Sequence, residues 1–178
     1  MIIVITRPEL CADEADRIKE MLLSGKADLV HIRKPSSTIV EVEQLLRHLP
    51  SELYGRIVLH DHFGLADDYC LRGIHLNSRH PQPPAKWKGA VSISCHSLSE
   101  LAKCREQAYD YMSLSPIFDS ISKPDYHSAF TAEALEEAHR QGLIDHRVMA
   151  LGGVTFERVP EVLQMGFGGA MILGDAWK

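Results

Sequence analysis

Short apolar runs rich in β-branched residues alternate along the chain with longer segments whose apolar residues recur at helical spacing. Runs of the first kind are typical of strands buried on both faces, because successive side chains on a strand point to opposite sides. Eight such strands are predicted, at residues 2–6, 29–33, 56–60, 73–76, 91–95, 110–114, 148–151 and 169–173.

Most of the segments between these strands predict amphipathic helices. In the first segment Ile18, Met21 and Leu22 repeat at the spacing that places side chains on one helix face. Ser97, with Glu100 three residues later, predicts a capping box at the start of another helix. The predicted helices cover residues 12–23, 40–49, 63–71, 98–107, 132–141 and 155–165.

The alternation predicts an α/β fold, a (β/α)₈ TIM barrel of eight parallel strands in a single domain over residues 1–178. A doubly wound open sheet is the structural alternative. Loops are expected at the proline-rich residues 81–84 and at residues 115–128. Because the sequence stops at Trp177-Lys178, just past the eighth strand, we expect the last helix to be missing or truncated. Another surface, such as the second subunit of a homodimer, would then cover that strand.

The composition narrows the classes of protein. A hydrophobic fraction of 45% and a charged fraction of 24% are ordinary for a globular protein. A net charge of -5 gives no support for nucleic-acid binding, which needs a basic stripe. No apolar run approaches the roughly 20 residues that span a bilayer, so no membrane interaction is expected. The four cysteines show neither a Cys-x-x-Cys pair nor zinc spacing, which predicts reduced thiols and a cytoplasmic location.

Glycines follow the last two predicted strands, in the loops that form the phosphate site of many TIM barrels. Gly152 and Gly153 follow the seventh strand, and Gly174-Asp175 follows the eighth. Glycine lets backbone N–H groups approach an anion closely, and the helix N-terminus expected at the Thr155 cap adds its dipole. A phosphate site is therefore predicted here, with a tight turn as the alternative explanation of the glycine pair.

Polar residues also follow the other strands. Arg33 and Lys123 are cations that could face a second anionic group, with Ser120 and Ser122 as hydroxyl donors. A solvated polar loop is the alternative for the last three. His96, at the end of the fifth strand, is the candidate general acid or base, because imidazole titrates near neutral pH, although a histidine at a strand end can be purely structural.

At these residues the sequence resembles the thiamine phosphate synthase superfamily, which includes the thiazole tautomerases (TenI-like proteins). The resemblance covers nearly the whole chain and rests on ordered motifs with the family's spacing. They are residues 28–33 (Asp-Leu-Val-His-Ile-Arg), 58–61 (Val-Leu-His-Asp), 73–76 (Gly-Ile-His-Leu), 94–97 (Ser-Cys-His-Ser), 111–118 with 120–123 (Ser-Ile-Ser-Lys), and 150–153 (Ala-Leu-Gly-Gly).

The resemblance implies one of two reactions in thiamine biosynthesis. Synthases join hydroxymethylpyrimidine diphosphate to thiazole phosphate with Mg²⁺ and release pyrophosphate. Tautomerases move a proton on the thiazole carboxylate phosphate to give its aromatic form and require no cofactor. Both use the same phosphate site.

Departures from the synthase motifs favour the tautomerase. His31 and His60 stand where synthases carry Gln and Asn, and His80 stands where they carry the second metal carboxylate. Asp61 is retained and would bind the metal if the synthase interpretation holds. Mg²⁺ prefers oxygen ligands, so a histidine at a ligand position disfavours it. In tautomerases the histidine of Ser-x-His-Ser transfers the proton, which assigns His96 that role.

The preferred interpretation is therefore a thiazole tautomerase with thiamine phosphate synthase as the alternative, acting on a phosphorylated thiazole. The residues assigned to substrate binding are His31, Arg33, His60, Ser94, Ser120, Ser122 and Lys123, and those assigned to the phosphate are Gly152, Gly153, Gly174 and Asp175.

Two further interpretations remain open. From another class, the chain could be a non-catalytic regulator that binds a phosphorylated ligand. A transition-metal site at His60, His62, His75 and His80 is the other, since converging imidazoles suit zinc. His75 alone is expected to be a packed interior residue.

Overall fold

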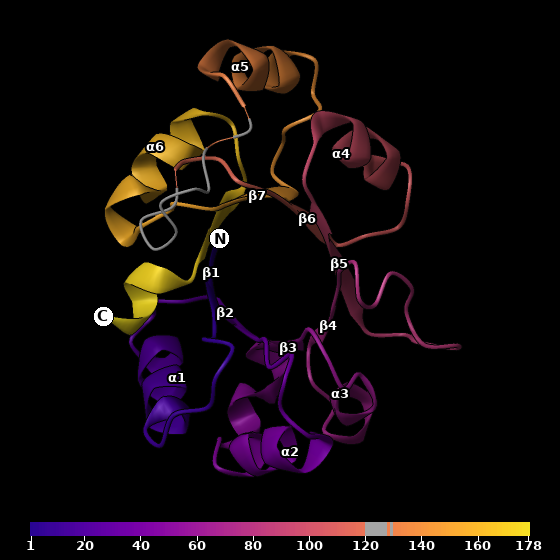
Figure 1. The fold of residues 1–178 in the computed structure, drawn as a ribbon, viewed down its shortest axis with the longest axis vertical. Helices are drawn as coiled ribbons and strands as arrows, with labels where there is room; N and C mark the ends of the chain where they lie inside the picture. The colour runs from indigo at the N-terminus through magenta and orange to yellow at the C-terminus, as the bar shows by residue number, and fades with distance from the viewer. Residues whose placement is uncertain (120–127, 129) are drawn as a thin grey trace. The chain divides into compact units, whose positions relative to one another are not determined.

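Eight parallel strands in the order β1 to β8 form a closed barrel in the computed structural model, which describes residues 1–119, 128 and 130–178 (Figure 1). This confirms the predicted TIM-barrel fold. The strands are β1 (Ile2–Ile5), β2 (Leu29–Ile32), β3 (Ile57–Leu59), β4 (Gly73–Leu76), β5 (Ala90–Cys95), β6 (Tyr111–Leu114), β7 (Val148–Leu151) and β8 (Gly169–Ile172).

The chain divides into two compact units, which are described separately. Residues Ile2–Val91 form the N-terminal unit, and Met1 with Ser92–Lys178 forms the C-terminal unit. The boundary falls within β5.

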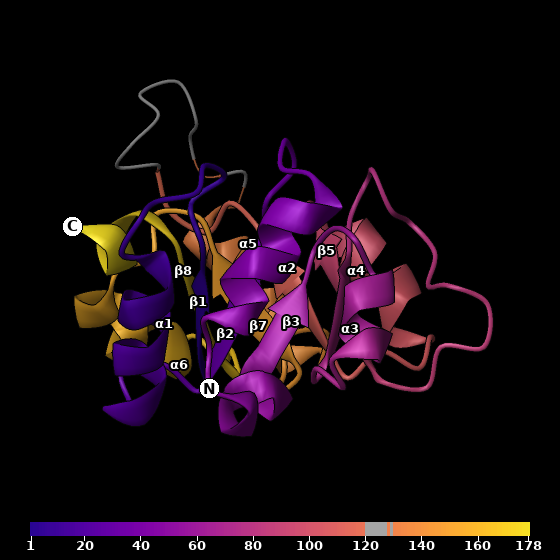
Figure 2. The same cartoon turned by 90° about the horizontal axis from the view of Figure 1, so that it is seen from below.

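The N-terminal unit packs its helices on one side of its strands (Figures 1 and 2). The helices are α1 (Glu14–Leu23), α2 (Ile39–Arg47), α3 (Gly64–Asp68) and the 3₁₀ helix η1 (Ser51–Arg56). Ile18 and Leu22 of α1 are almost fully buried, as their helical spacing predicted, and so is Leu46 of α2. The parallel ladder pairs Val30 with both Val4 and Ile57, so apolar residues line its centre.

The C-terminal unit repeats this arrangement with α4 (Leu98–Arg105), α5 (Ala132–Arg140), α6 (Val159–Gln164), η2 (Phe156–Arg158) and η3 (Gly174–Trp177). Its strands β5 to β8 pair in parallel, and the buried residues include Leu101, Leu135 and Val162, one from each helix. After β8 the chain forms only the short helix η3, which buries Trp177.

All six helices are somewhat shorter than predicted, and two of them differ most. Helix α3 ends at Asp68, and Cys70 then adopts a positive φ of 49°, which cannot continue a right-handed helix. The segment expected to be one helix from Thr155 begins instead with η2, and α6 starts only at Val159 with Pro160 in its first turn. Proline has no N–H to donate and a fixed φ, so it suits a helix start.

The predicted capping box at Ser97 is half formed. The Ser97 hydroxyl accepts the N–H of Glu100 at 3.1 Å, but the Glu100 carboxylate accepts the N–H of His96 at 2.7 Å. Thr38, which the prediction overlooked, forms a complete capping box with Glu41 at the start of α2.

Residues 77–89, between β4 and β5, form a loop with no helix, which extends away from α3 (Figures 1 and 2). It includes the loop predicted from the prolines at residues 81–84. No helix in the described part of the chain is long and apolar enough to cross a membrane.

Candidate active site

Three histidines of the N-terminal unit share one face of the sheet because of the strand register. His31 of β2 pairs with Val58 of β3, and Val58 pairs with Gly73 of β4. Side chains two residues apart on a strand lie on the same side, so His60 and His75 join His31 on that face. The ladder therefore brings together three residues that are far apart in sequence.

The three imidazole rings are in contact and buried. Nδ1 of His31 and Nε2 of His60 share a hydrogen bond of 2.9 Å, and the ring centroids of His60 and His75 stack at 4.3 Å. Burial lowers the pKa of all three histidines; the pKa of His75 falls to about 3, and those of His31 and His60 fall well below their usual value. The cluster is therefore uncharged at neutral pH.

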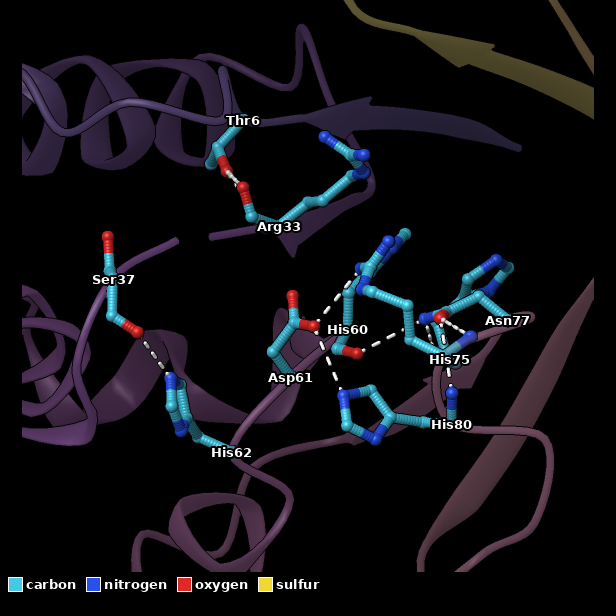
Figure 3. Close-up of polar contacts among 10 residues, drawn as sticks. Thr6, Arg33, Ser37, His60, Asp61, His62, His75, Asn77 and His80 are labelled. Atoms are coloured by element: carbon cyan, nitrogen blue, oxygen red, sulfur yellow. Dashed lines mark hydrogen bonds and ion pairs between the residues drawn. The ribbon is translucent and has the colours of Figure 1, made fainter. Parts of the chain in front are cut away.

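Asp61, just after β3, is held by two basic side chains (Figure 3). Its Oδ1 accepts from Nη2 of Arg79 at 3.0 Å and lies 3.3 Å from Nε2 of His80. Its Oδ2 is buried and has no hydrogen-bond partner among the described residues. The carboxylate thus already balances a guanidinium and lies beside an imidazole.

Arg33 follows β2 with its side chain half-buried near this group. Burial lowers the pKa of its guanidinium, Arg79 lowers that pKa further, and Asp61 raises it. Two guanidinium groups therefore influence each other beside one carboxylate. The Arg33 backbone is fixed by its N–H, which donates to the Thr6 hydroxyl at 2.9 Å.

The predicted group of four metal-binding histidines is wrong in two members. The ring of His62 points away from Asp61, and its Nε2 lies 2.8 Å from the Ser37 carbonyl (Figure 3). His80 pairs with Asp61 instead of joining the cluster. Among the described residues, the only group of three that brings one ligand atom of each within 4.8 Å of the others is His31, His60 and His75.

His96 lies at the end of β5 in the C-terminal unit, with an exposed ring. Its Nδ1 shares a hydrogen bond of 3.1 Å with the hydroxyl of Ser115, a buried residue after β6. That bond orients the ring and leaves Nε2 as the nitrogen that could exchange a proton with a ligand. The backbone N–H of His96 is fixed by Glu100. Ser94, two residues earlier, lies on β5 opposite Ser113 of β6.

Gly152 and Gly153 follow β7 with positive φ values of 93° and 64°. A Cβ on Gly152 would lie 2.7 Å from Cα of Pro116, and one on Gly153 would lie 2.8 Å from Cβ of Phe118. The glycines are therefore required by the close approach of the segment after β6, whether or not a phosphate binds. This is the tight-turn explanation, and it is compatible with anion binding by the same N–H groups.

Gly174 begins η3, and a Cβ there would have open space around it. Oδ2 of the neighbouring Asp175 accepts the N–H of Phe156 at 3.1 Å, and its Oδ1 accepts from Lys178 at 2.8 Å. Thr155 makes no side-chain capping bond. The Asp175 carboxylate therefore accepts an N–H at the start of this helix, a capping role that was expected of the Thr155 hydroxyl.

Three candidate residues, Ser120, Ser122 and Lys123, lie outside the described residues. Ser115 and Arg79 are members of the candidate site that were not predicted from the sequence. Ser115 could have been found as the polar residue ending a strand beside His96. Arg79 gave no such signal, because its contact with Asp61 depends on how the loop after β4 folds.

The group formed by Asp61, Arg79 and His80 does not fit the Mg²⁺ that the synthase resemblance implies. Mg²⁺ requires oxygen ligands in near-octahedral geometry, and carboxylates usually supply them. Here Arg79 neutralises the retained carboxylate, and the second expected carboxylate is His80. Positive charge at this position would also repel a divalent cation.

Comparisons with known proteins agree on one family. A sequence model described as thiamine monophosphate synthase (TMP-TENI) matches residues 2–174. The thiamine-phosphate synthase of Limosilactobacillus fermentum is 26% identical over 173 residues, covering 89% of this chain and 80% of the relative. The thiamine-phosphate synthase of Shouchella clausii is 24% identical over 157 residues, covering 84% of this chain and 74% of the relative.

Solved structures give the same result. The crystal structure of thiamine phosphate pyrophosphorylase from Bacteroides thetaiotaomicron is 41% identical, with a TM-score of 0.87 over 99% of this chain and 84% of that one. The corresponding protein of Pyrococcus furiosus, at 21% identity and a TM-score of 0.77 over 97% of this chain and 84% of its own, shares the fold. The predicted resemblance is confirmed, and this chain belongs to the thiamine monophosphate synthase family.

Proposed function

We propose that the chain is an enzyme of thiamine biosynthesis that acts on a phosphorylated thiazole, and that it couples this thiazole to a pyrimidine diphosphate. The observation that carries this proposal is the 41% identity to a thiamine phosphate pyrophosphorylase over 99% of the chain. The two curated relatives described above are also named thiamine-phosphate synthases. These names favour the coupling reaction over the tautomerase reaction that the sequence motifs favoured.

The N-terminal unit would bind the diphosphate with cations. Arg33 and Arg79 present guanidinium groups, whose planar donors suit phosphate oxygens, and His80 lies beside them. Asp61 holds Arg79 in place. Because this group does not fit Mg²⁺, we derive no step through the metal and expect coupling to depend less on Mg²⁺ than in a site with two carboxylates.

In the C-terminal unit we assign the thiazole phosphate to the backbone N–H groups of Gly152, Gly153 and Gly174. Asp175 would hold the nearby Phe156 amide in position. Ser94 would contact the substrate in this unit. The assignment of His31 and His60 to substrate binding stays a prediction from the sequence, because both rings are buried. The assignment of Ser120, Ser122 and Lys123 to substrate binding remains a prediction from the sequence.

The tautomerase reaction is the second candidate, and the geometry of His96 favours it. The bond to Ser115 uses Nδ1 and orients the imidazole of this exposed residue, so that Nε2 could remove a proton at one position and return it at another. This reaction needs no metal, so the misfit at Asp61 does not affect it. A positioned imidazole of this kind typically contributes about 10²–10⁴-fold in rate.

Two assays on the same preparation distinguish the candidates. One measures pyrophosphate release from hydroxymethylpyrimidine diphosphate and thiazole phosphate, with and without Mg²⁺. The other measures aromatisation of the thiazole carboxylate phosphate. We expect coupling by the wild type, and absence of pyrophosphate release under both conditions would overturn the first candidate.

His96→Ala tests the second candidate, with His146→Ala as a matched control at an exposed histidine. If the chain is a tautomerase, His96→Ala lowers the aromatisation rate by about 10²–10⁴-fold and His146→Ala leaves it unchanged. Equal rates in wild type and His96→Ala would remove His96 from the mechanism. Tight binding of thiazole phosphate with neither reaction would contradict both candidates and identify a binding protein.

A further inference from the structure

We propose that His31, His60 and His75 form a binding site for one transition-metal cation of the zinc class. One ring nitrogen from each histidine lies within 4.8 Å of the other two. The three residues come from β2, the end of β3 and β4, so a hydrogen-bonded ladder positions them. This proposal does not depend on which reaction the chain catalyses.

Coordination requires the rings to rotate, because a bound metal lies in the plane of each imidazole and the rings of His60 and His75 are stacked at 25° to each other. A Zn–N bond of about 2.0–2.1 Å in tetrahedral geometry places two ligand nitrogens roughly 3.4 Å apart. The nitrogens of His31 and His60 are 2.9 Å apart and would separate slightly. The widest separation, at most 4.8 Å, would have to shorten by about 1.4 Å. Side-chain torsions can supply such movements without displacing the strands.

The protonation state of the cluster also favours a metal. Only neutral imidazole can ligate a cation, and burial keeps all three histidines neutral. The proton shared by Nδ1 of His31 and Nε2 of His60 would move to the other nitrogen of the same ring. Coordination therefore requires a change of tautomer and no loss of a proton to solvent.

The cluster supplies three protein ligands, and a neighbouring amide helps to hold two of them. The Asn77 amide donates to the His60 carbonyl at 3.2 Å and weakly to the His75 carbonyl at 3.4 Å, which ties two ligand-bearing backbones together (Figure 3). Three histidines with a fourth, exchangeable position are typical of catalytic zinc sites. Arg33 and Arg79 act on His60 from nearby, and their positive charge will weaken cation binding.

This site differs in chemistry from the magnesium site that the synthase resemblance implies. Imidazole nitrogens select zinc, cobalt, nickel or copper, whereas Mg²⁺ requires oxygen. His80 and Asp61 belong to the separate ion-pair group described above.

The test uses the untagged full chain, stripped with a chelator and titrated with Co²⁺ as a spectroscopic probe. We expect one Co²⁺ per chain, the intense visible absorption of tetrahedral cobalt, and its loss when Zn²⁺ is added. Mg²⁺ in excess should not displace the cobalt. A folded wild-type protein that takes up no stoichiometric Co²⁺ or Zn²⁺ overturns the proposal, as does full displacement by Mg²⁺.

Variants locate the metal. His31→Phe and His75→Phe keep an aromatic ring in the buried cluster and should each weaken cobalt binding by more than about tenfold. His48→Ala, at an exposed histidine, and His80→Ala should leave the affinity unchanged. Equal binding in wild type and both phenylalanine variants overturns the proposal. If a phenylalanine variant does not fold, the wild-type titration still decides it.

Discussion

Lys34 is a cation with almost no exposed surface, and its partners explain how it can be buried. Its Nζ lies 2.6 Å from Oε1 of Glu14, and the two side chains are only 1% and 0% exposed. The ammonium also donates to the carbonyls of Arg7 and Glu9 at 2.7 and 2.8 Å. Burial raises the pKa of Glu14, and Lys34 counteracts that rise. This pair ties the segment after β1 to the residue that follows Arg33.

Lys34→Met should lower the free energy of unfolding by about 3–5 kcal/mol, because it leaves the Glu14 carboxylate buried without its cation. Arg47→Met is the matched control, since Arg47 pairs with Glu43 on the exposed surface of α2 and should change stability by about 0–1 kcal/mol. Urea unfolding measures both. A similar loss in the two variants would contradict the prediction, and adding Glu14→Gln to Lys34→Met should recover part of the stability.

At the scale of the element, Thr38 and Thr155 occupy equivalent N-cap positions with different contacts. Oγ1 of Thr38 accepts the Glu41 N–H, and the Glu41 carboxylate accepts the Thr38 N–H at 2.7 Å. Thr155 makes no side-chain capping bond, because the carboxylate of Asp175 serves the adjacent amide. The same residue type at the same position therefore contributes differently.

Thr38→Ala should lower the free energy of unfolding by about 1 kcal/mol, which is typical for loss of an N-cap hydrogen bond. Thr155→Ala should have an effect of only a few tenths of a kcal/mol, on the same scale. Thermal unfolding of the two variants beside the wild type makes the comparison. Equal losses would show that a property of threonine other than capping is responsible.

The positions of the strands and helices were predictable from the sequence, but the residues at which the helices begin and end were less so. Periodicity placed every strand within about two residues of its observed ends. The helix ends depended on single backbone conformations, such as the positive φ of Cys70 after α3, which composition does not reveal. The capping partner of Glu100 was wrong for a similar reason, since His96 and Ser97 offer neighbouring N–H groups.

At the scale of the whole molecule, eight repeats of one unit made the closed barrel predictable. In TIM barrels, polar residues at the ends of the strands form the active site, and this rule led to the prediction of His31, His60 and Asp61 as candidate residues. Contacts that depend on strand register or loop conformation were not predictable. His75 was expected to be a packed residue, and its stacking on His60 requires the pairing of Val58 with Gly73.

The stability of the metal-free protein should fall as the pH is lowered below about 6.5. The unfolded chain protonates His31, His60 and His75 near that pH, whereas the folded chain resists protonation, with the pKa of His75 at about 3. Their stabilising effect is therefore complete above pH 6.5 and is lost as the pH falls, by about 1.4 kcal/mol per pH unit for each histidine.

Urea unfolding at several pH values between 6.5 and 5 measures this dependence. Carboxylates titrate mainly below this range, and comparison with a variant removes their contribution. The free energy of unfolding of His75→Phe should depend less steeply on pH than that of the wild type. The difference between the two slopes should equal the contribution of one histidine. Identical slopes in the two proteins would mean that His75 is not buried in its neutral form.

The carboxylate of Asp175 on the Phe156 amide has a consequence for turnover. A phosphate group that approaches this amide would exchange one anion for another, so the net gain in binding would be a difference between two similar interactions. When the phosphate leaves, the carboxylate can return and satisfy the amide again. In the proposed phosphate site, Asp175 would therefore act as an internal competitor that limits how tightly phosphorylated compounds are held and eases the release of product.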